Sequence, residues 1–301
     1  MPGAAGGLWH RRPVSAPPSF VPLSSSPEGH PGTVRGASAL RAEDDARDTR
    51  DAFFAKRVRQ VLSPIPGTPF RMTSYGRGHI PHMADTAILD IDGTLVDTNY
   101  QHALAWFRAL GRYDVWLPVW RIHRHIGMGG DRLVTALAGE DVERRHGDAL
   151  RDAWVEEFDV FLDDIRPFEG ATELLDELGG RGFTVVLASS GKPQHVEHFL
   201  DLIDGRSRCR AWTTSEDVEA TKPAPDLLQV ALAKVEGASG VAVGDSTWDF
   251  LAARRAGIPG IGLRTGGFSP EELREAGAGH VFDSLPELIG NLGRTPLRAP
   301  P

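Results

Sequence analysis

The sequence predicts an α/β fold, a doubly wound parallel sheet of Rossmann-like type with an inserted helical cap domain. Three observations predict it. Short apolar runs alternate with helical stretches from residue 84 onward, a pattern typical of parallel strands that are buried on both faces. Residues 98–166 interrupt this alternation with helical patterns alone. Several apolar runs end at polar or charged side chains, as expected where parallel strands meet a ligand crevice.

The expected elements follow from these patterns in chain order. Strands are expected at 86–91, 183–188, 211–214, 241–243, 260–263 and 280–282. Helices are expected between them at 171–181, 194–203, 225–235, 247–256 and 269–276. Within the interruption, helical patterns cover 100–110, 116–125, 131–137 and 141–164. We therefore expect a catalytic core formed by 83–97 and 167–294, a helical cap at 98–166 and a tail at 295–301.

Residues 1–82 differ from the rest of the chain in composition. They contain 11 of the 22 prolines and lack sustained apolar periodicity, so we expect a disordered, low-complexity N-terminal extension. They carry 11 Lys/Arg against 6 Asp/Glu, whereas residues 83–301 carry 22 against 35. The acidic body gives no support to nucleic-acid binding, and no nucleic-acid partner is expected.

The composition also narrows the compartment. The single cysteine, Cys209, excludes an internal disulfide and a zinc–cysteine cluster, which fits a reducing environment. No run of about 20 apolar residues is present, so no membrane span is expected. The N-terminus lacks the order of a secretory signal. We therefore expect a cytoplasmic protein.

Two carboxylates follow the first expected strand, in Asp90-Ile91-Asp92-Gly93-Thr94. Side chains at i and i+2 of an extended segment point the same way, so Asp90 and Asp92 can face one reacting group. One carboxylate can attack phosphorus while the other moves protons. An acidic turn with Gly93 as the turn residue is the alternative.

Two further strand regions lead into phosphate-binding chemistry. Ser189, followed by Ser190 and Gly191, can bind a phosphate oxygen together with backbone N–H groups, although a serine that caps the next helix is the alternative. Lys222 lies in a proline-rich stretch that fixes the backbone, so its ammonium group can neutralise a phosphate and a nucleophile.

An acidic pair follows the expected strand at 241–243. Asp245 lies at the strand end, and Asp249 lies one helical turn later, so both can face the same crevice. With Asp90 they form an oxygen-rich site suited to Mg²⁺. Alternatively, Asp249 is an early-turn acid favoured by the helix dipole.

In this order the four motifs resemble those of the haloacid dehalogenase-like hydrolase superfamily. The matching residues are Asp90 and Asp92, Ser189, Lys222, and Asp245 with Asp249. The helical insertion resembles the type I cap of phosphoglycolate phosphatase-like and β-phosphoglucomutase-like members.

The resemblance implies roles for these residues. Asp90 attacks phosphorus and forms an aspartyl-phosphate, and Asp92 protonates the leaving oxygen and then activates water. Mg²⁺ is held by Asp90, the carbonyl of Asp92 and Asp245, with Asp249 in support. Phosphate contacts fall to Ser189, Lys222, Thr94, Ser190 and Gly191. The presence of Asp92 favours phosphorus chemistry over dehalogenation.

The cap is expected to set the substrate, a small phosphorylated metabolite that the sequence does not identify. His102, Arg124 and His125 are candidates for substrate contact, and a solvated helix end is the alternative for the last two. The four tryptophans of the cap are expected in its hydrophobic core: Trp106, Trp116, Trp120 and Trp154.

Two other functions are open. A β-phosphoglucomutase-like mutase shares the cap, but the loop 127–131 has no basic residue that could grip a second phosphate. A non-catalytic binding or regulatory member is the alternative of another class, which the complete motif set disfavours. Whether the protein is a monomer or a homodimer is undetermined by the sequence.

Overall fold

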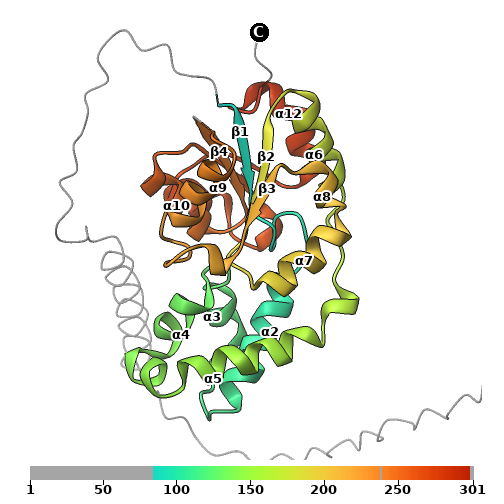
Figure 1. Cartoon of the computed structure of the whole chain (residues 1–301). Helices are drawn as coiled ribbons and strands as arrows, with labels where there is room; N and C mark the ends of the chain where they lie inside the picture. The colour runs from blue at the N-terminus through green and yellow to red at the C-terminus, as the bar shows by residue number, and fades with distance from the viewer. Residues whose placement is uncertain (1–83, 238, 299–301) are drawn as a thin grey trace, which may run out of the picture. The chain divides into compact units, whose positions relative to one another are not determined.

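The computed structural model describes residues 84–237 and 239–298. The extension expected at 1–82 lies outside these residues. Within them, a six-stranded sheet forms the centre of the core, with all strands parallel in the order β3-β2-β1-β4-β5-β6 (Figure 1). The strands are β1 (Thr86–Leu89), β2 (Thr184–Ala188), β3 (Ala211–Thr213), β4 (Gly240–Gly244), β5 (Gly260–Leu263) and β6 (Ala278–Phe282). The predicted doubly wound parallel sheet is confirmed.

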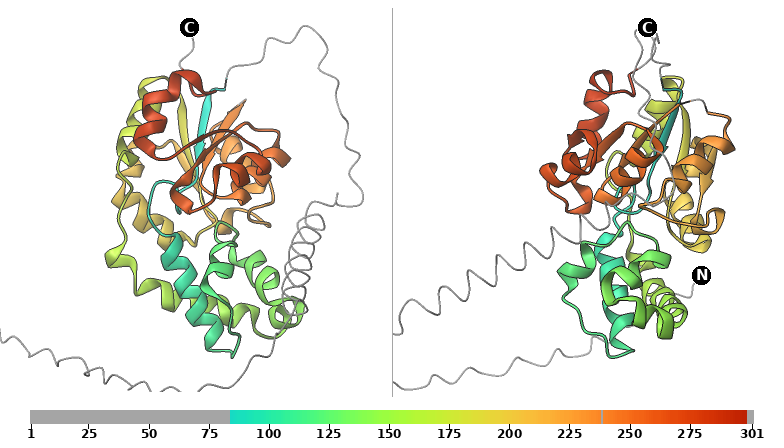
Figure 2. Two further views of the ribbon diagram at one scale, coloured as in Figure 1. Left: turned by 180° about the vertical axis from the view of Figure 1, so that it is seen from behind. Right: turned by 90° about the vertical axis from the view of Figure 1, so that its left-hand side faces the viewer.

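Both faces of the sheet are covered by helices, as Figure 2 shows from the side. Alternate residues of β1 point to opposite faces. Ala87 and Leu89 join one buried cluster, while Ile88 joins another. The first cluster includes α6 (Ala171–Gly180), α7 (Pro193–Leu202) and α12 (Leu285–Asn291), and the second includes α9 (Asp226–Lys234) and α10 (Thr247–Ala256). The continuous apolar run of β1 therefore reflects burial on both sides.

The remaining core elements are short. They are α8 (Gly205–Arg208), α11 (Pro270–Ala276), η2 (Ser215–Asp217), η3 (Arg264–Gly266) and η4 (Leu292–Arg294). Three helices of the core begin with a reciprocal capping box, in which a Ser or Thr side chain and an acid three residues later bond each other's backbone N–H. These caps were not singled out from the sequence, except that Asp249 was considered as an early-turn acid.

The cap consists of four α-helices and a terminal turn. These are α2 (Asn99–Gly111), α3 (Val119–His123), α4 (Gly130–Ala138), α5 (Glu140–Asp159) and η1 (Leu162–Asp164). The helix expected at 116–125 is shorter, because Pro118 is extended and α3 begins only after it. No helix of the described residues is long and apolar enough to cross a membrane.

The cap tryptophans divide into two pairs. Trp106 and Trp154 are 3% and 8% exposed and stack at 5.5 Å between ring centroids. Trp116 and Trp120 are 64% and 67% exposed, so their expected place in the cap core is wrong. Trp120 lies on α3, where the short helix buries Ile122 instead. The cap and one face of the sheet share a continuous buried cluster.

Candidate active site

The candidate site lies at the carboxyl ends of three adjacent strands. Asp90 follows β1, Ser189 follows β2 and Asp245 follows β4, while β2 and β4 flank β1 in the sheet. The Asp90 N–H donates to the carbonyl of Val243 at 2.9 Å, which extends the β1–β4 ladder to the first catalytic candidate. The sheet therefore brings together side chains that are far apart in the sequence.

Asp90 is paired with Lys222 in a buried setting. The Lys222 Nζ lies 2.5 Å from Asp90 Oδ1 and 2.8 Å from Asp249 Oδ1, and these side chains are 2–5% exposed. Burial raises the pKa of Asp90, and the neighbouring carboxylates raise it further, against the effect of Lys222. Burial lowers the pKa of Lys222, but Asp249 and Asp90 raise it more, so the ammonium form is favoured. Lys222 is thus the fixed cation of the site.

Asp249 is fixed from its other oxygen. Its Oδ2 accepts from Ser246 Oγ at 2.6 Å and from the Ser246 N–H at 3.0 Å. This capping box places Asp249 in the first turn of α10 and turns its Oδ1 to Lys222. The carboxylate therefore serves the helix cap and the charged site at once.

Asp245 is held by two residues between the end of β1 and the first turn of α2. Its Oδ1 accepts from Thr94 Oγ1 at 2.8 Å, and its Oδ2 accepts from Asn99 Nδ2 at 2.8 Å. Burial, followed by the charge of Asp249, raises the pKa of Asp245 to about 7. Gly93 has φ +77, and a Cβ there would lie 2.5 Å from Asp245 Oδ2, so a glycine is required beside this carboxylate.

Three carboxylates could hold a metal ion. One oxygen from each of Asp90, Asp245 and Asp249 lies within 4.8 Å of the others. Their mutual repulsion and burial, visible in the raised pKa of Asp90 and Asp245, would be relieved by a divalent cation. The donor set is all oxygen, which suits Mg²⁺ among other hard cations. The residues present therefore fit the expected metal.

The Asp92 side chain points toward the beginning of α2. Its Oδ1 accepts from Thr98 Oγ1 at 3.0 Å and lies 2.9 Å from His102 Nε2, and its Oδ2 accepts from Ser189 Oγ at 3.1 Å. Burial raises the pKa of Asp92, but His102 and the two hydroxyls outweigh burial and lower it. In the absence of substrate the carboxylate form of Asp92 is thus favoured, which is the form that can accept a proton.

The predicted phosphate-binding residues take two kinds of position. Ser190, Gly191 and Lys222 line the cavity above Asp90. The hydroxyl of Ser189 instead donates to Asp92, and that of Thr94 donates to Asp245. The Gly191 N–H donates to Ser189 Oγ at 2.9 Å. Among the described residues Ser190 Oγ is buried without a partner, which leaves it available to a ligand oxygen.

A cavity of about 320 Å³ separates these core residues from the cap. Its cap wall is mostly apolar and comes from α2, α5, α4 and the loop before α4, namely from Trp106, Trp154, Leu133, Ile126 and Met128. His102 joins this wall to Asp92, because its ring stacks on Phe158 at 4.0 Å and on Trp154 at 5.5 Å. The cap side of the cavity is therefore largely aromatic.

Of the cap candidates, the structure brings only His102 into the cavity wall. Arg124 pairs with Glu272 of the core, and its guanidinium lies over Phe268 at 4.1 Å. His125 Nδ1 lies 2.9 Å from the Arg121 carbonyl, and its ring lies beside Trp248. Arg124 and His125 therefore contribute to packing between the cap and the core.

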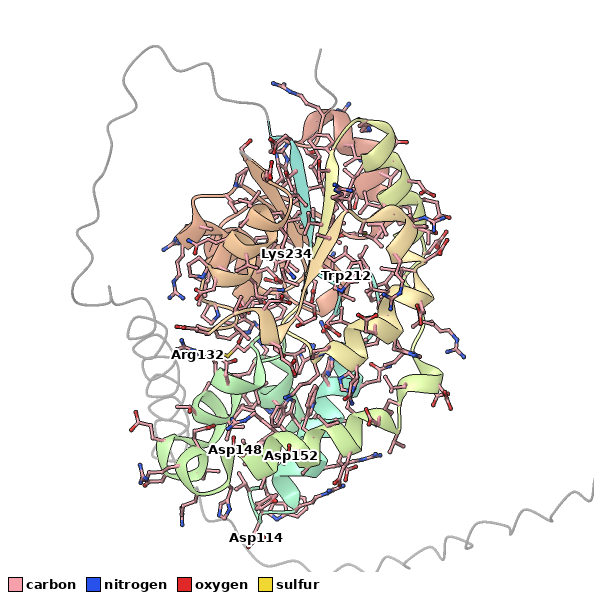
Figure 3. All side chains as sticks on the ribbon, in the orientation of Figure 1. Asp114, Arg132, Asp148, Asp152, Trp212 and Lys234 are labelled. Carbon is pink, nitrogen blue, oxygen red and sulfur yellow. The ribbon has the colours of Figure 1, made fainter. Side chains whose placement is uncertain are left out.

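Several residues of the site were missed from the sequence. Asn99 and Thr98 donate hydrogen bonds to Asp245 and Asp92. Arg151, on α5 between the labelled Asp148 and Asp152 (Figure 3), also lines the cavity. The only available signal was the position of Thr98 and Asn99 at the first helix after the Asp90 motif.

Comparisons with known proteins agree with this geometry. Residues 84–257 match the haloacid dehalogenase-like hydrolase family. "Probable phosphatase IndB" of Dickeya dadantii is 27% identical over 69% of this chain and 93% of its own length. "Phosphoglycolate phosphatase" of Caulobacter vibrioides is 30% identical over 66% and 87%.

A solved structure is similar over the same region. A hydrolase from Pseudomonas syringae superimposes with a TM-score of 0.66 at 32% identity, covering 69% of this chain and 98% of its own. The family match spans more than half of the sequence and includes Asp90, Ser189, Lys222 and Asp245. The chain therefore belongs to the haloacid dehalogenase-like hydrolases, and it is an enzyme of their kind.

Proposed function

We propose that this protein is a Mg²⁺-dependent phosphatase that hydrolyses a small phosphorylated metabolite through an aspartyl-phosphate. One observation carries the proposal: the Asp90 carboxylate borders the cavity beside the buried Lys222 ammonium, with Asp92 two residues away. A nucleophile, a fixed cation and a proton-transferring carboxylate are what phosphoryl transfer needs. The phosphatase names of two relatives support hydrolysis.

The proposed reaction has two steps. An Asp90 oxygen attacks phosphorus, the bond from phosphorus to the substrate oxygen breaks, and Asp92, which enters this step in its protonated carboxyl form, gives its proton to that leaving oxygen. Asp92 then takes a proton from a water whose oxygen attacks phosphorus, and the bond between phosphorus and Asp90 breaks. Free Asp90 and inorganic phosphate result. His102, Thr98 and Ser189 hold Asp92 for both transfers.

Charge neutralisation completes the mechanism. Mg²⁺ held by Asp90, the Asp92 carbonyl and Asp245, with Asp249 in support, would supply Lewis-acid stabilisation of the phosphoryl oxygens. Lys222, whose Nζ lies 2.5 Å from Asp90 Oδ1, can neutralise the same charge. Lys192, which lines the cavity next to Gly191, has no side-chain partner among the described residues and can meet a phosphoryl oxygen.

The structure disfavours the mutase alternative. Transfer between two positions of a sugar needs a cap cation that grips a second phosphate. The loop residues Gly127, Met128, Gly129 and Gly130 that line the cavity carry no charge, and Arg132 lies beyond them with its side chain 54% exposed (Figure 3).

The location proposed is the cytoplasm, for which the single cysteine is the support.

Hydrolysis of p-nitrophenyl phosphate tests the proposal. We expect turnover with Mg²⁺, none after chelation, and loss of at least about 10³-fold in kcat for Asp90→Asn. Asp97→Asn is the matched control, since Asp97 is exposed and follows the motif closely. A D90N variant with near-normal turnover would overturn the mechanism. Glucose 1-phosphate separates the alternatives: free phosphate supports hydrolysis, and glucose 6-phosphate supports a mutase.

A further inference from the structure

The cavity is larger than a phosphoryl group requires. Its 320 Å³ would hold about ten water molecules at their liquid volume. The phosphoryl end is marked by Asp90, Lys222 and Ser190, so the remaining space faces the group that departs from phosphorus. The side chains that line this space therefore indicate which kind of alcohol the substrate carries.

The leaving-group wall begins at the proton donor. Asp92 contacts His102, His102 stacks on Trp154, and Trp154 stacks on Trp106. An alcohol oxygen that takes its proton from Asp92 thus leaves from a position next to two buried indoles. Met128 and Leu133 continue the same wall. Aromatic and aliphatic side chains at this point favour an apolar face on the alcohol.

The same wall lacks a free cation for a second anion. Arg151 is the one arginine or lysine that the described cap contributes to the cavity, and its guanidinium is already engaged. It donates to both oxygens of Glu143 at 2.9 and 3.2 Å, to Asp148 at 2.8 Å and to the Gly130 carbonyl at 3.2 Å. A guanidinium neutralised by two carboxylates offers little to a substrate carboxylate.

The exposed part of the cavity lining is negatively charged. Glu216 and Glu219 line it, are exposed and have no side-chain partner among the described residues. Asp131, on the cap side, accepts a hydrogen bond from the Thr221 hydroxyl and lies 3.5 Å from Arg132 Nε, so the unpaired negative charge comes from the two glutamates. The unpaired Lys192 follows Gly191 directly and so belongs to the phosphoryl end. Beyond the phosphate, the cavity therefore disfavours negative charge.

Resting on the proposed phosphatase activity, we propose that the enzyme selects phosphate monoesters whose alcohol has an apolar face and no second anionic group. Phosphoglycolate, the substrate in the name of one relative, carries a carboxylate at the position where this cavity is apolar and acidic. It is accordingly a poor substrate here, despite its small size.

Three substrates with alkyl leaving groups test the inference: ethyl phosphate, benzyl phosphate and phosphoglycolate. Release of inorganic phosphate at saturating Mg²⁺ gives kcat/KM for each. Burial of a phenyl group predicts an advantage of about tenfold or more for benzyl over ethyl phosphate. We expect phosphoglycolate to fall at least about fivefold below ethyl phosphate. Benzyl phosphate no better than ethyl phosphate, or phosphoglycolate better than both, would overturn it.

Two variants assign the effect to the cap wall. Trp106→Leu should lower the benzyl-to-ethyl ratio at least about fivefold, whereas Trp120→Leu, an exposed indole of the same cap, should leave the ratio unchanged. If Trp106→Leu does not fold, Met128→Lys serves instead, with Met128→Leu as its control. The added ammonium should raise the phosphoglycolate-to-ethyl ratio about tenfold, and an unchanged ratio contradicts the inference.

Failure of this inference is distinguishable from failure of the proposed function. Turnover of p-nitrophenyl phosphate that Asp90→Asn abolishes, together with no preference among the three alkyl esters, retains the phosphatase and rejects the substrate class. Absence of turnover on every ester rejects both.

Discussion

The two ends of the cavity are built by different physical means. At the core end, Asp90, Asp245 and Asp249 are buried and fixed by charge pairs and hydrogen bonds of 2.5–2.8 Å. At the cap end, Trp106 and Trp154 are fixed by stacking and burial, and their ring atoms carry no charge.

This difference separates chemistry from selection. The core end gains from pre-organised charges, because charge develops on the phosphoryl group during transfer. Under the proposed substrate preference, the cap end would discriminate through contact area and through the absence of a free cation. Changes at the core should therefore alter turnover with every substrate, and changes at the cap should alter the ranking of substrates.

The largest expected effect is at the shared cation of the core. Lys222→Met leaves Asp90 and Asp249 buried without their common partner. We expect kcat/KM to fall by about 10²–10³-fold for all substrates. Unpaired buried charges should also cost about 3–5 kcal/mol of unfolding free energy without Mg²⁺. Lys234→Met, at a partly exposed lysine paired with Asp217, is the control. Equal loss in both variants would contradict the assignment.

The next effect concerns Phe158, whose ring packs between a histidine of the cap and a histidine of the core. Phe158 is fully buried, with its ring 4.0 Å from His102 and 4.8 Å from His195 of α7. Phe158→Ala removes the ring that lies between cap and core histidines, and should cost about 3–5 kcal/mol in urea unfolding. Val160→Ala, two residues on and 67% exposed, should cost far less. Similar midpoints for the two variants would show that the junction does not stabilise the fold.

A smaller effect is expected at Asn99, the first residue of α2, which contacts the proposed metal site. Asn99 donates to Asp245 Oδ2 at 2.8 Å and is 3% exposed. Asn99→Ala frees that oxygen, so the Mg²⁺ concentration for half-maximal activity should rise by about 10–100-fold. Asn291→Ala, at an asparagine outside the site that bonds the Glu287 carbonyl, provides the control. A metal dependence unchanged by Asn99→Ala would remove Asn99 from the support of the metal site.

Part of the core end could be predicted from sequence because three of its residues follow strands. Asp90, Ser189 and Asp245 each lie directly after an apolar run, and parallel strands place their carboxyl ends on one edge. The expected role of Thr94 did not account for Asp245 as a partner, because a hydroxyl beside phosphate and a hydroxyl on a carboxylate look the same in a sequence.

The cap end could not be predicted in the same way. Arg124 and His125 have the chemistry of anion binding, but Arg124 is held by Glu272 and Phe268 of the core. Trp106 and Trp120 look equivalent in the sequence, yet one is buried at the cavity and the other is exposed. Helical periodicity indicates which residues share a face, and it does not indicate which helix packs against that face.

The sequence by itself determined the sheet, the helical cap and the candidate groups for the proposed chemistry, since strand periodicity and carboxylate spacing are local properties. Only the tertiary structure decided the contacts that join distant elements: Asn99 on Asp245, His102 between Asp92 and Phe158, and Arg151 neutralised by Glu143. These contacts depend on how helices of the cap pack on each other and on the core, which is a long-range property. Which charges stay free to meet a substrate is therefore decided by packing.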